Sequence, residues 1–180
     1  MIEDRRAAKV SRDEDGRPLS NRIRDGIRWW MEDGECWVSF QECFERNLGL
    51  ALRTGQAKRC VRAAFWPHAR VRWESETQAV AQFDAEAQER DAILGGLADK
   101  LCKVALRPLT PRELLAALPI TNRERLRWTK SGRIPRHGTV NIRRGQIVAV
   151  PTYSVTVVEE LLLDAGRIEN WRASDLTNMG

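Results

Sequence analysis

The sequence predicts a mainly α-helical protein with a small β-hairpin wing, in which an N-terminal helical bundle precedes a C-terminal winged helix-turn-helix. Three observations favour this fold class. A pair of short capped helices fits residues 110–131, a β-branched hairpin fits 139–150, and apolar residues recur at helical spacing through most of 20–106. A chain of 180 residues has room for one domain or two small ones.

Residues that start and stop helices bound the first helix of the pair. Thr110 and Glu113 have the spacing of a capping box, and Pro111 suits the first helical position, where its missing N–H would be unsatisfied anyway. An apolar face of leucines follows, and Pro119 ends the helix. We therefore expect a helix from Pro111 to Leu118.

The second helix opens after Thr121 and Asn122, either of which can cap its free N–H groups, and Gly132 stops it. Two helices joined by a turn of three to four residues form a helix-turn-helix, whose second helix can lie in the DNA major groove. We therefore expect helix 122–131 to be a recognition helix for double-stranded DNA.

Cationic and amide side chains on and after this helix are the candidate DNA contacts. Arg123, Arg127 and Lys130 fall at i, i+4 and i+7, so they line one face. Asn pairs with adenine and Arg with guanine, each pair discriminating by about 1–3 kcal/mol. Contacts to phosphate position a protein without specifying sequence. The predicted DNA-binding residues of this segment are Thr121, Asn122, Arg123, Arg127, Lys130, Arg133 and Arg136.

A hairpin and a closing helix are expected after this pair. Residues 139–150 predict two strands that flank Arg143-Arg144-Gly145. A hairpin after a helix-turn-helix is a wing, and Arg143 and Arg144 at its tip would contact backbone phosphate or a minor groove. Ser154 is expected to cap a helix over 155–165, and 167–180 reads as a tail that Trp171 anchors.

The positive charge is concentrated in this half of the chain. Residues 1–106 hold 18 Lys and Arg and 18 Asp and Glu, which cancel, whereas 107–180 hold 12 against 7, the whole net charge of +5. Within 107–144 there are 10 basic residues and 2 acidic ones, a net +8. Such asymmetry indicates a polyanion as partner, the alternative being a solvated basic face.

The N-terminal half carries further helical signals. Residues 1–19 are polar and predict a flexible arm. The predicted helices of a domain over 20–73 cover 20–31, 37–49 and 54–64, followed by an extended stretch at 68–73. The helices within 37–66 also have helix-turn-helix spacing and a basic second member. They are either a second DNA-binding unit or part of an ordinary bundle.

The longest helical pattern spans residues 74–106. Seven of its eight heptad a and d positions are apolar, as in a coiled-coil seam, although Gly95-Gly96 argues against one rigid rod. We expect a long helix that links the two halves. Its apolar stripe lies either in a dimer interface or in the interior of the monomer.

The recognition segment resembles a known family. Arg127-Trp128 followed by 130–135 (KSGRIP) is similar to the end of the excisionase-like winged helix-turn-helix, within the MerR superfamily. Leu109-Thr110 with the following ELLAALPIT, Val150-Pro151, and the helix through 158–162 are similar to the family's opening helix, second wing strand and closing helix. Arg125 stands where the family has an apolar core residue.

The resemblance covers residues 108–165. It implies a DNA-binding module with Asn122, Arg123 and Arg127 toward the groove and a wing on the flanking backbone. Members of the family are phage or plasmid excisionases, other recombination directionality factors, and small transcription regulators.

Other classes of protein find little support in the sequence. There is no apolar run of membrane-spanning length and no secretory signal at the N-terminus, so we expect a cytoplasmic, nucleoid-associated protein. Cys36, Cys43, Cys60 and His68 lack the spacing of a structural zinc site, and we expect no metal or other cofactor. His68 and His137 have no sequence setting that suggests catalysis, so we do not expect an enzyme.

These patterns predict a sequence-specific DNA-binding protein, a regulator of transcription or an excision factor of a phage or other mobile element. We expect a homodimer on double-stranded DNA, with the N-terminal helical domain open to a protein partner. The alternative is a phage-like DNA-packaging or assembly adaptor that forms a larger oligomer of the small-terminase kind. Oligomeric state separates the two hypotheses.

Overall fold

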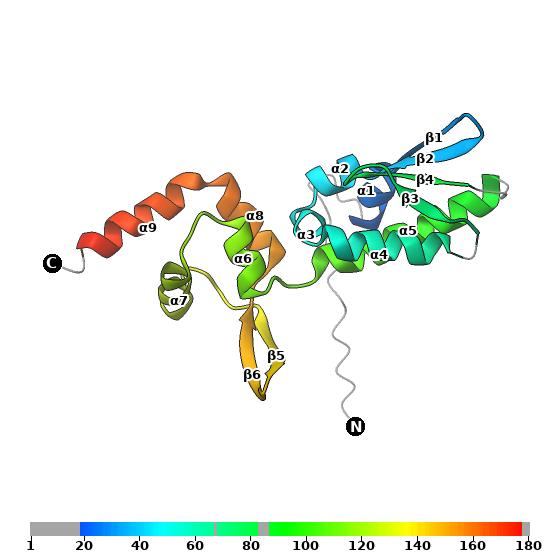
Figure 1. The fold of residues 1–180 in the computed structure, drawn as a ribbon. Helices are drawn as coiled ribbons and strands as arrows, with labels where there is room; N and C mark the ends of the chain where they lie inside the picture. The colour runs from blue at the N-terminus through cyan, green and yellow to red at the C-terminus, as the bar shows by residue number, and fades with distance from the viewer. Residues whose placement is uncertain (1–18, 67, 83–86, 178–180) are drawn as a thin grey trace, which may run out of the picture. The chain divides into compact units, whose positions relative to one another are not determined.

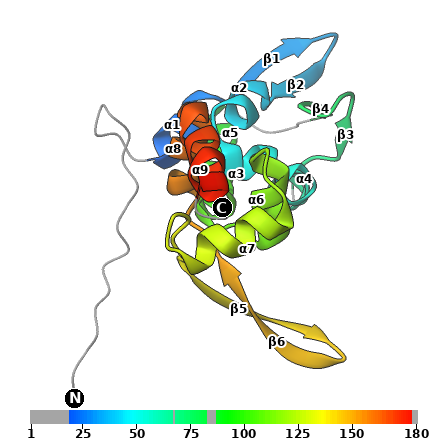
Figure 2. The same cartoon turned by 90° about the vertical axis from the view of Figure 1, so that its left-hand side faces the viewer.

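A computed structural model describes residues 19–66, 68–82 and 87–177 (Figures 1 and 2). The chain divides into two compact units, Met1–Val104 and Ala105–Gly180. The described residues form nine helices and two antiparallel sheets, so the fold is mixed α and β, and the expected "mainly α" class fits only loosely. No helix in these ranges is both long and apolar enough to cross a membrane.

The N-terminal unit combines helices with a four-stranded antiparallel sheet. Its elements are α1 (Leu19–Asp25), β1 (Arg28–Glu32), β2 (Glu35–Ser39), α2 (Gln41–Glu45), α3 (Leu48–Ala51), α4 (Thr54–Phe65), β3 (Val71–Trp73), β4 (Gln78–Ala81) and α5 (Ala87–Leu106). The strand order is β1-β2-β4-β3, with α4 and α5 on one side of the sheet (Figure 1).

The first two strands form a tight hairpin. Glu32 pairs with Glu35, so Asp33 and Gly34 make a two-residue loop. Their φ angles of 51° and 78° are both positive, as a type I′ turn requires, and this turn matches the twist of the strands that it joins. Alternate residues of β2 are buried, which places Cys36 and Val38 on the covered face of the sheet.

The prediction of an N-terminal helical bundle is therefore wrong in part, because this unit also contains a four-stranded sheet. The helix predicted over 20–31 ends at Asp25, and β1 replaces its second half; the helix predicted over 37–49 is a strand followed by two short helices. The second DNA-binding unit that was one alternative for 37–66 therefore lacks a long first helix. The helix predicted at 54–64 is confirmed as α4. The extended stretch predicted at 68–73 contains β3.

The linking helix predicted over 74–106 is also shorter than expected. Its first part contains β4, and α5 begins only at Ala87. Leu97, Leu101 and Val104 on α5 are buried in the monomer, which agrees with the interior alternative for this stripe. A hydrogen bond also connects the start of α4 with α5, because Arg53 Nη1 donates to the Val104 carbonyl over 2.7 Å.

The C-terminal unit has its elements close to their predicted places. They are α6 (Pro111–Ala117), α7 (Asn122–Lys130), β5 (Gly138–Arg144), β6 (Gln146–Thr152), α8 (Val155–Leu163) and α9 (Ala165–Thr177). Strands β5 and β6 form a two-stranded antiparallel hairpin that projects away from α6 and α7 (Figures 1 and 2). The tail expected at 167–180 is wrong, since α9 continues to Thr177.

Candidate nucleic-acid interface

Matched capping boxes fix where α6 and α7 begin. At α7, Thr121 Oγ1 accepts from the Glu124 amide over 3.2 Å, and Glu124 Oε2 accepts from the Thr121 amide over 2.7 Å. Thr110 and Glu113 make the same pair of contacts at α6. Each box satisfies two N–H groups that a helix start would otherwise leave unpaired. Thr121, predicted as a DNA contact, therefore serves first as a helix cap.

The exposed face of α7 holds most of the predicted contact residues. Its inner face is buried through Arg125, Trp128 and Thr129. The residues of the opposite face, all exposed, are Asn122, Arg123, Leu126, Arg127 and Lys130. Leu126 lies among the cations with 55% of its surface exposed. The helix thus presents an amide, three cations and one apolar side chain together.

Helix α9 packs against one flank of α7 through aromatic rings. Trp128 is fully buried, and its ring meets that of Trp171 edge-on with centroids 5.1 Å apart. Ile168, one turn earlier on α9, is buried as well. The expectation that Trp171 anchors the end of the chain is confirmed.

A carboxylate on α9 joins three groups of the helix-turn-helix. Asp175 accepts hydrogen bonds from Trp128 Nε1 over 2.8 Å and from Arg133 Nη1 over 2.7 Å, and it forms an ion pair with Arg127 Nη2 over 2.5 Å. The tryptophan hydrogen bond, followed by the hydrogen bond from Arg133, lowers the pKa of Asp175 below its usual value. The carboxylate is therefore ionised at neutral pH and holds Arg127 and Arg133 against α9.

A second ion pair fastens α9 to the start of α7. Arg172 Nε donates to Glu124 Oε1 over 2.8 Å, and its Nη2 donates to the Pro119 carbonyl in the turn between α6 and α7 over 2.7 Å. The hydrogen bond from Arg172, supplemented by the cap contacts with Thr121, lowers the pKa of Glu124 to about 2.

This pKa shift predicts a dependence of stability on pH. Because folding lowers the pKa of Glu124 from 4.5 to about 2, its ionic contribution is complete above pH 4.5 and is lost as the pH falls toward about 2. Glu124→Gln keeps a cap but does not ionise. We expect wild type to exceed this variant in unfolding free energy at neutral pH, and the difference to close across that window.

Urea unfolding at a series of pH values measures the difference. The control is the same comparison in an Arg172→Met background, where the principal cause of the shift is absent and the difference above pH 4.5 should be smaller. A difference between wild type and Glu124→Gln that stays constant down to pH 2 would contradict the assignment.

On the other flank, a buried polar network ties α7 to the end of the hairpin. Arg125 is only 7% exposed, and its Nη1 donates to the Tyr153 hydroxyl over 2.8 Å while its Nε donates to Asn122 Oδ1 over 2.9 Å. Thr129 Oγ1 lies 3.1 Å from the same hydroxyl. Tyr153 itself forms backbone hydrogen bonds with Leu109, just before α6. This position, where the excisionase-like modules that the segment resembles have an apolar residue, is thus filled here by a hydrogen-bonded arginine.

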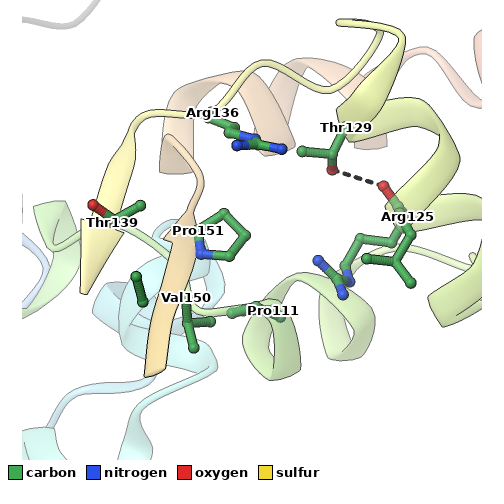
Figure 3. Close-up of a pocket in the computed structure, with 9 residues that line it drawn as sticks. Pro111, Arg125, Thr129, Arg136, Thr139, Val150 and Pro151 are labelled. Atoms are coloured by element: carbon green, nitrogen blue, oxygen red, sulfur yellow. Dashed lines mark hydrogen bonds between the residues drawn. The ribbon is translucent and has the colours of Figure 1, made fainter. Parts of the chain in front are cut away.

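A pocket of about 480 Å³ lies between α7 and the base of the hairpin (Figure 3). Arg125 and Thr129 line it from α7, and Thr139 and Pro151 line it from β5 and β6. Arg136 joins them from the segment that leads into β5. Most of the wall is apolar, so the two guanidinium groups supply its charge.

The seven cations among the predicted contact residues fall into three groups. Arg123, Lys130, Arg136 and Arg143 are exposed, and Arg143 lies near the tip of the hairpin opposite Ile147. Arg127 and Arg133 are engaged by Asp175, with 40% and 27% of their side chains exposed. The Arg144 side chain lies outside what the structure describes.

No known family model, curated protein or solved structure matches this chain. The resemblance to excisionase-like modules therefore stays a prediction.

The cysteines and acidic residues give no metal site in the described ranges. There, no three His, Cys, Asp or Glu side chains gather closely enough to hold an ion. The four cysteines are free thiols. Burial raises the pKa of Cys43 to about 12, and its thiol donates to the Ile23 carbonyl. Cys43 is therefore a neutral core group.

Proposed function

We propose that this protein binds double-stranded DNA through its C-terminal unit, with α7 in the major groove and the β5–β6 hairpin on the neighbouring backbone. In this role it is a regulator of transcription or of a mobile element. The observation that carries the proposal is the exposed face of α7, where Asn122, Arg123, Leu126 and Lys130 project together from a helix fixed on both flanks.

The chemistry of this face suits the edges of base pairs. Arg123 offers a planar, bidentate donor for guanine, and Leu126 offers an apolar surface for a thymine methyl group. Leu126 would gain by such a contact, because 55% of its surface is exposed to water and a thymine methyl group would cover part of it. Rigid support matters equally, since a recognition helix discriminates between bases only when its side chains hold their positions.

The hairpin adds charge beside this face. Arg136 and Arg143 are exposed on the segment before β5 and near the hairpin tip. Contacts of this kind to phosphate raise affinity for every sequence equally. The net charge of +8 over 107–144 supports the same division of roles, because most of it lies on α7 and the hairpin.

A binding experiment on two kinds of duplex tests the proposal. Sequences enriched by the wild-type protein from a random pool are compared with the unselected pool by fluorescence anisotropy at two salt concentrations. Arg123→Ala should lose about 1–3 kcal/mol of preference for the enriched sequences, because it removes one bidentate base contact. Arg143→Ala should weaken both duplexes alike and lower the salt dependence by about one charge.

Arg167→Ala is the matched control, since Arg167 is exposed on α9 and pairs with Asp164 away from the proposed interface. It should leave both affinities unchanged. Absence of binding at low salt would overturn the proposal. Equal effects of the Arg123 and Arg143 substitutions on preference would show that the roles of helix and hairpin are misassigned.

A further inference from the structure

Strand β1 lies at an edge of the N-terminal sheet, where β2 is its neighbour on the inner side. All five of its residues, Arg28–Glu32, are exposed. Trp29, Trp30 and Met31 leave 41%, 38% and 50% of their surfaces in contact with solvent. An edge strand can also add a further strand on its outer side through its backbone N–H and C=O groups.

The two edges of this sheet differ in how they are protected. At the other edge, β3 has only three residues, and Arg72 forms ion pairs with Glu74 and with Glu35. Short length and charge are the usual devices that prevent an edge from pairing. Strand β1 has five residues with three large apolar side chains at its centre, and it contains neither proline nor lysine.

We propose that β1 is a dimerisation edge, which pairs antiparallel with β1 of a second copy of this chain in a register centred on Trp30. This is the one antiparallel register that uses all five residues of both strands. It would join the two sheets into one of eight strands around a two-fold axis.

Charge complementarity supports a second copy as the occupant. In this register Arg28 of each copy lies opposite Glu32 of the other, so two opposite-charge pairs flank the centre. Arg28 is available for this contact, because 70% of its side chain is exposed despite a 3.3 Å ion pair with Glu42. Because β1 begins with a cation and ends with an anion, two antiparallel copies of it bring opposite charges together at both ends.

Apolar side chains match in the same register. Trp29 would face Met31 of the second copy on one side of the sheet, and Trp30 would face its own counterpart on the other. Within one copy Trp30 already stacks on Trp37, with ring centroids 6.0 Å apart and planes at 15°. Pairing would therefore extend this stack into a row of four indoles, and cross-strand aromatic pairs stabilise sheets.

The proposed interface would produce a closed dimer and not an open-ended assembly. An isologous contact between identical strands uses the same patch on both subunits and stops at two copies. The dimer would carry two copies of α7, and hence two recognition helices. The inference rests on the N-terminal unit alone and does not depend on whether the protein binds DNA.

A charge-swap experiment on the full-length protein tests the register. Sedimentation equilibrium in the absence of DNA measures the dissociation constant over a broad concentration range. Glu32→Arg places like charges opposite each other twice, so we expect the dimer to be about tenfold weaker or more. The double variant Arg28→Glu with Glu32→Arg restores two opposite-charge pairs and should recover dimerisation.

Glu45→Arg is the control, because Glu45 is exposed on α2 and its substitution changes the charge of the same unit equally. It should leave the dimer unchanged, and circular dichroism should show that every variant is folded. A wild-type protein that stays monomeric, or one that assembles beyond two copies, would overturn the proposal. So would a dimer that Glu32→Arg leaves intact or that the double variant does not recover.

Discussion

Trp128→Ala is expected to lower the unfolding free energy of this protein by about 3–5 kcal/mol, the usual cost of truncating a large buried aromatic side chain. Trp128 is fully buried, packs edge-on against Trp171 and donates to Asp175. The substitution therefore leaves a cavity between α7 and α9 and removes a hydrogen bond at the same place. Both effects should loosen α9.

Urea unfolding combined with amide hydrogen exchange of α7 and α9 measures this loss and locates it. Leu126→Ala is the matched control on the same helix, because Leu126 is 55% exposed and its truncation should change stability by no more than about 0.5 kcal/mol. Under the proposed function the control should nevertheless weaken binding to enriched DNA. Similar destabilisation by the two substitutions would contradict the packing described for α7.

Tyr153→Phe is expected to cost about 1–3 kcal/mol, although it removes a single oxygen atom. The Tyr153 hydroxyl accepts from the Arg125 guanidinium and lies within hydrogen-bond distance of Thr129. Without it, the Nη1 group of a buried cation loses its partner. The cost of leaving such a group unpaired exceeds the net gain from forming the bond.

Arg125→Met gives the opposite expectation at the same site. Methionine fills a similar space without a charge. The Tyr153 hydroxyl keeps Thr129 Oγ1 as a partner at 3.1 Å and Asn122 is exposed to water, so replacing the buried cation by an apolar side chain should be nearly neutral or stabilising. Thermal unfolding of both variants and of their combination forms a double-mutant cycle. If Tyr153→Phe costs as much in the Arg125→Met background as in wild type, the Arg125–Tyr153 hydrogen bond is not the source of the loss.

The C-terminal unit was largely predictable because its signals are local. Thr110 with Glu113, and Thr121 with Glu124, carry the two capping boxes within four residues each, and the structure contains both. Gly132 has a positive φ of 80°, as expected where a helix stops. Charge, caps and the hairpin pattern agreed with one another, and such agreement is what makes a prediction reliable.

The sequence analysis did not predict the N-terminal sheet, because the helical spacing of apolar residues in 23–30 was given more weight than the hairpin signal at Asp33-Gly34. Ile23, Ile27 and Trp30 fall at the spacing of a single helical face, and Asp33-Gly34 can also end a helix. Asp-Gly between aromatic and β-branched runs is the strongest local signal for a two-residue hairpin, and the structure contains that hairpin. Strand pairing also depends on β4, forty residues away, which no local pattern reveals.

Helix α9 has a weak helical pattern in the sequence. Ile168, Trp171, Arg172 and Asp175 fall at i, i+3, i+4 and i+7, and they are the residues that contact the helix-turn-helix or are buried beside it. Two of the four are charged, so the face did not stand out as apolar. Their partners on α7 lie more than forty residues earlier in the chain, and only the folded unit brings them together.

Asp175 affects how the affinity of this protein for DNA would depend on salt concentration. A cation that leaves water for a phosphate normally frees the small ions condensed on the nucleic acid, and the affinity then falls with added salt in proportion to the number of such cations. Arg127 and Arg133 already have a counter-ion of the protein's own, the Asp175 carboxylate. If either arginine binds a DNA phosphate, it gives up its ion pair with Asp175. The loss of that ion pair then offsets part of the free energy gained from the phosphate contact. The salt slope would then understate the cations facing DNA.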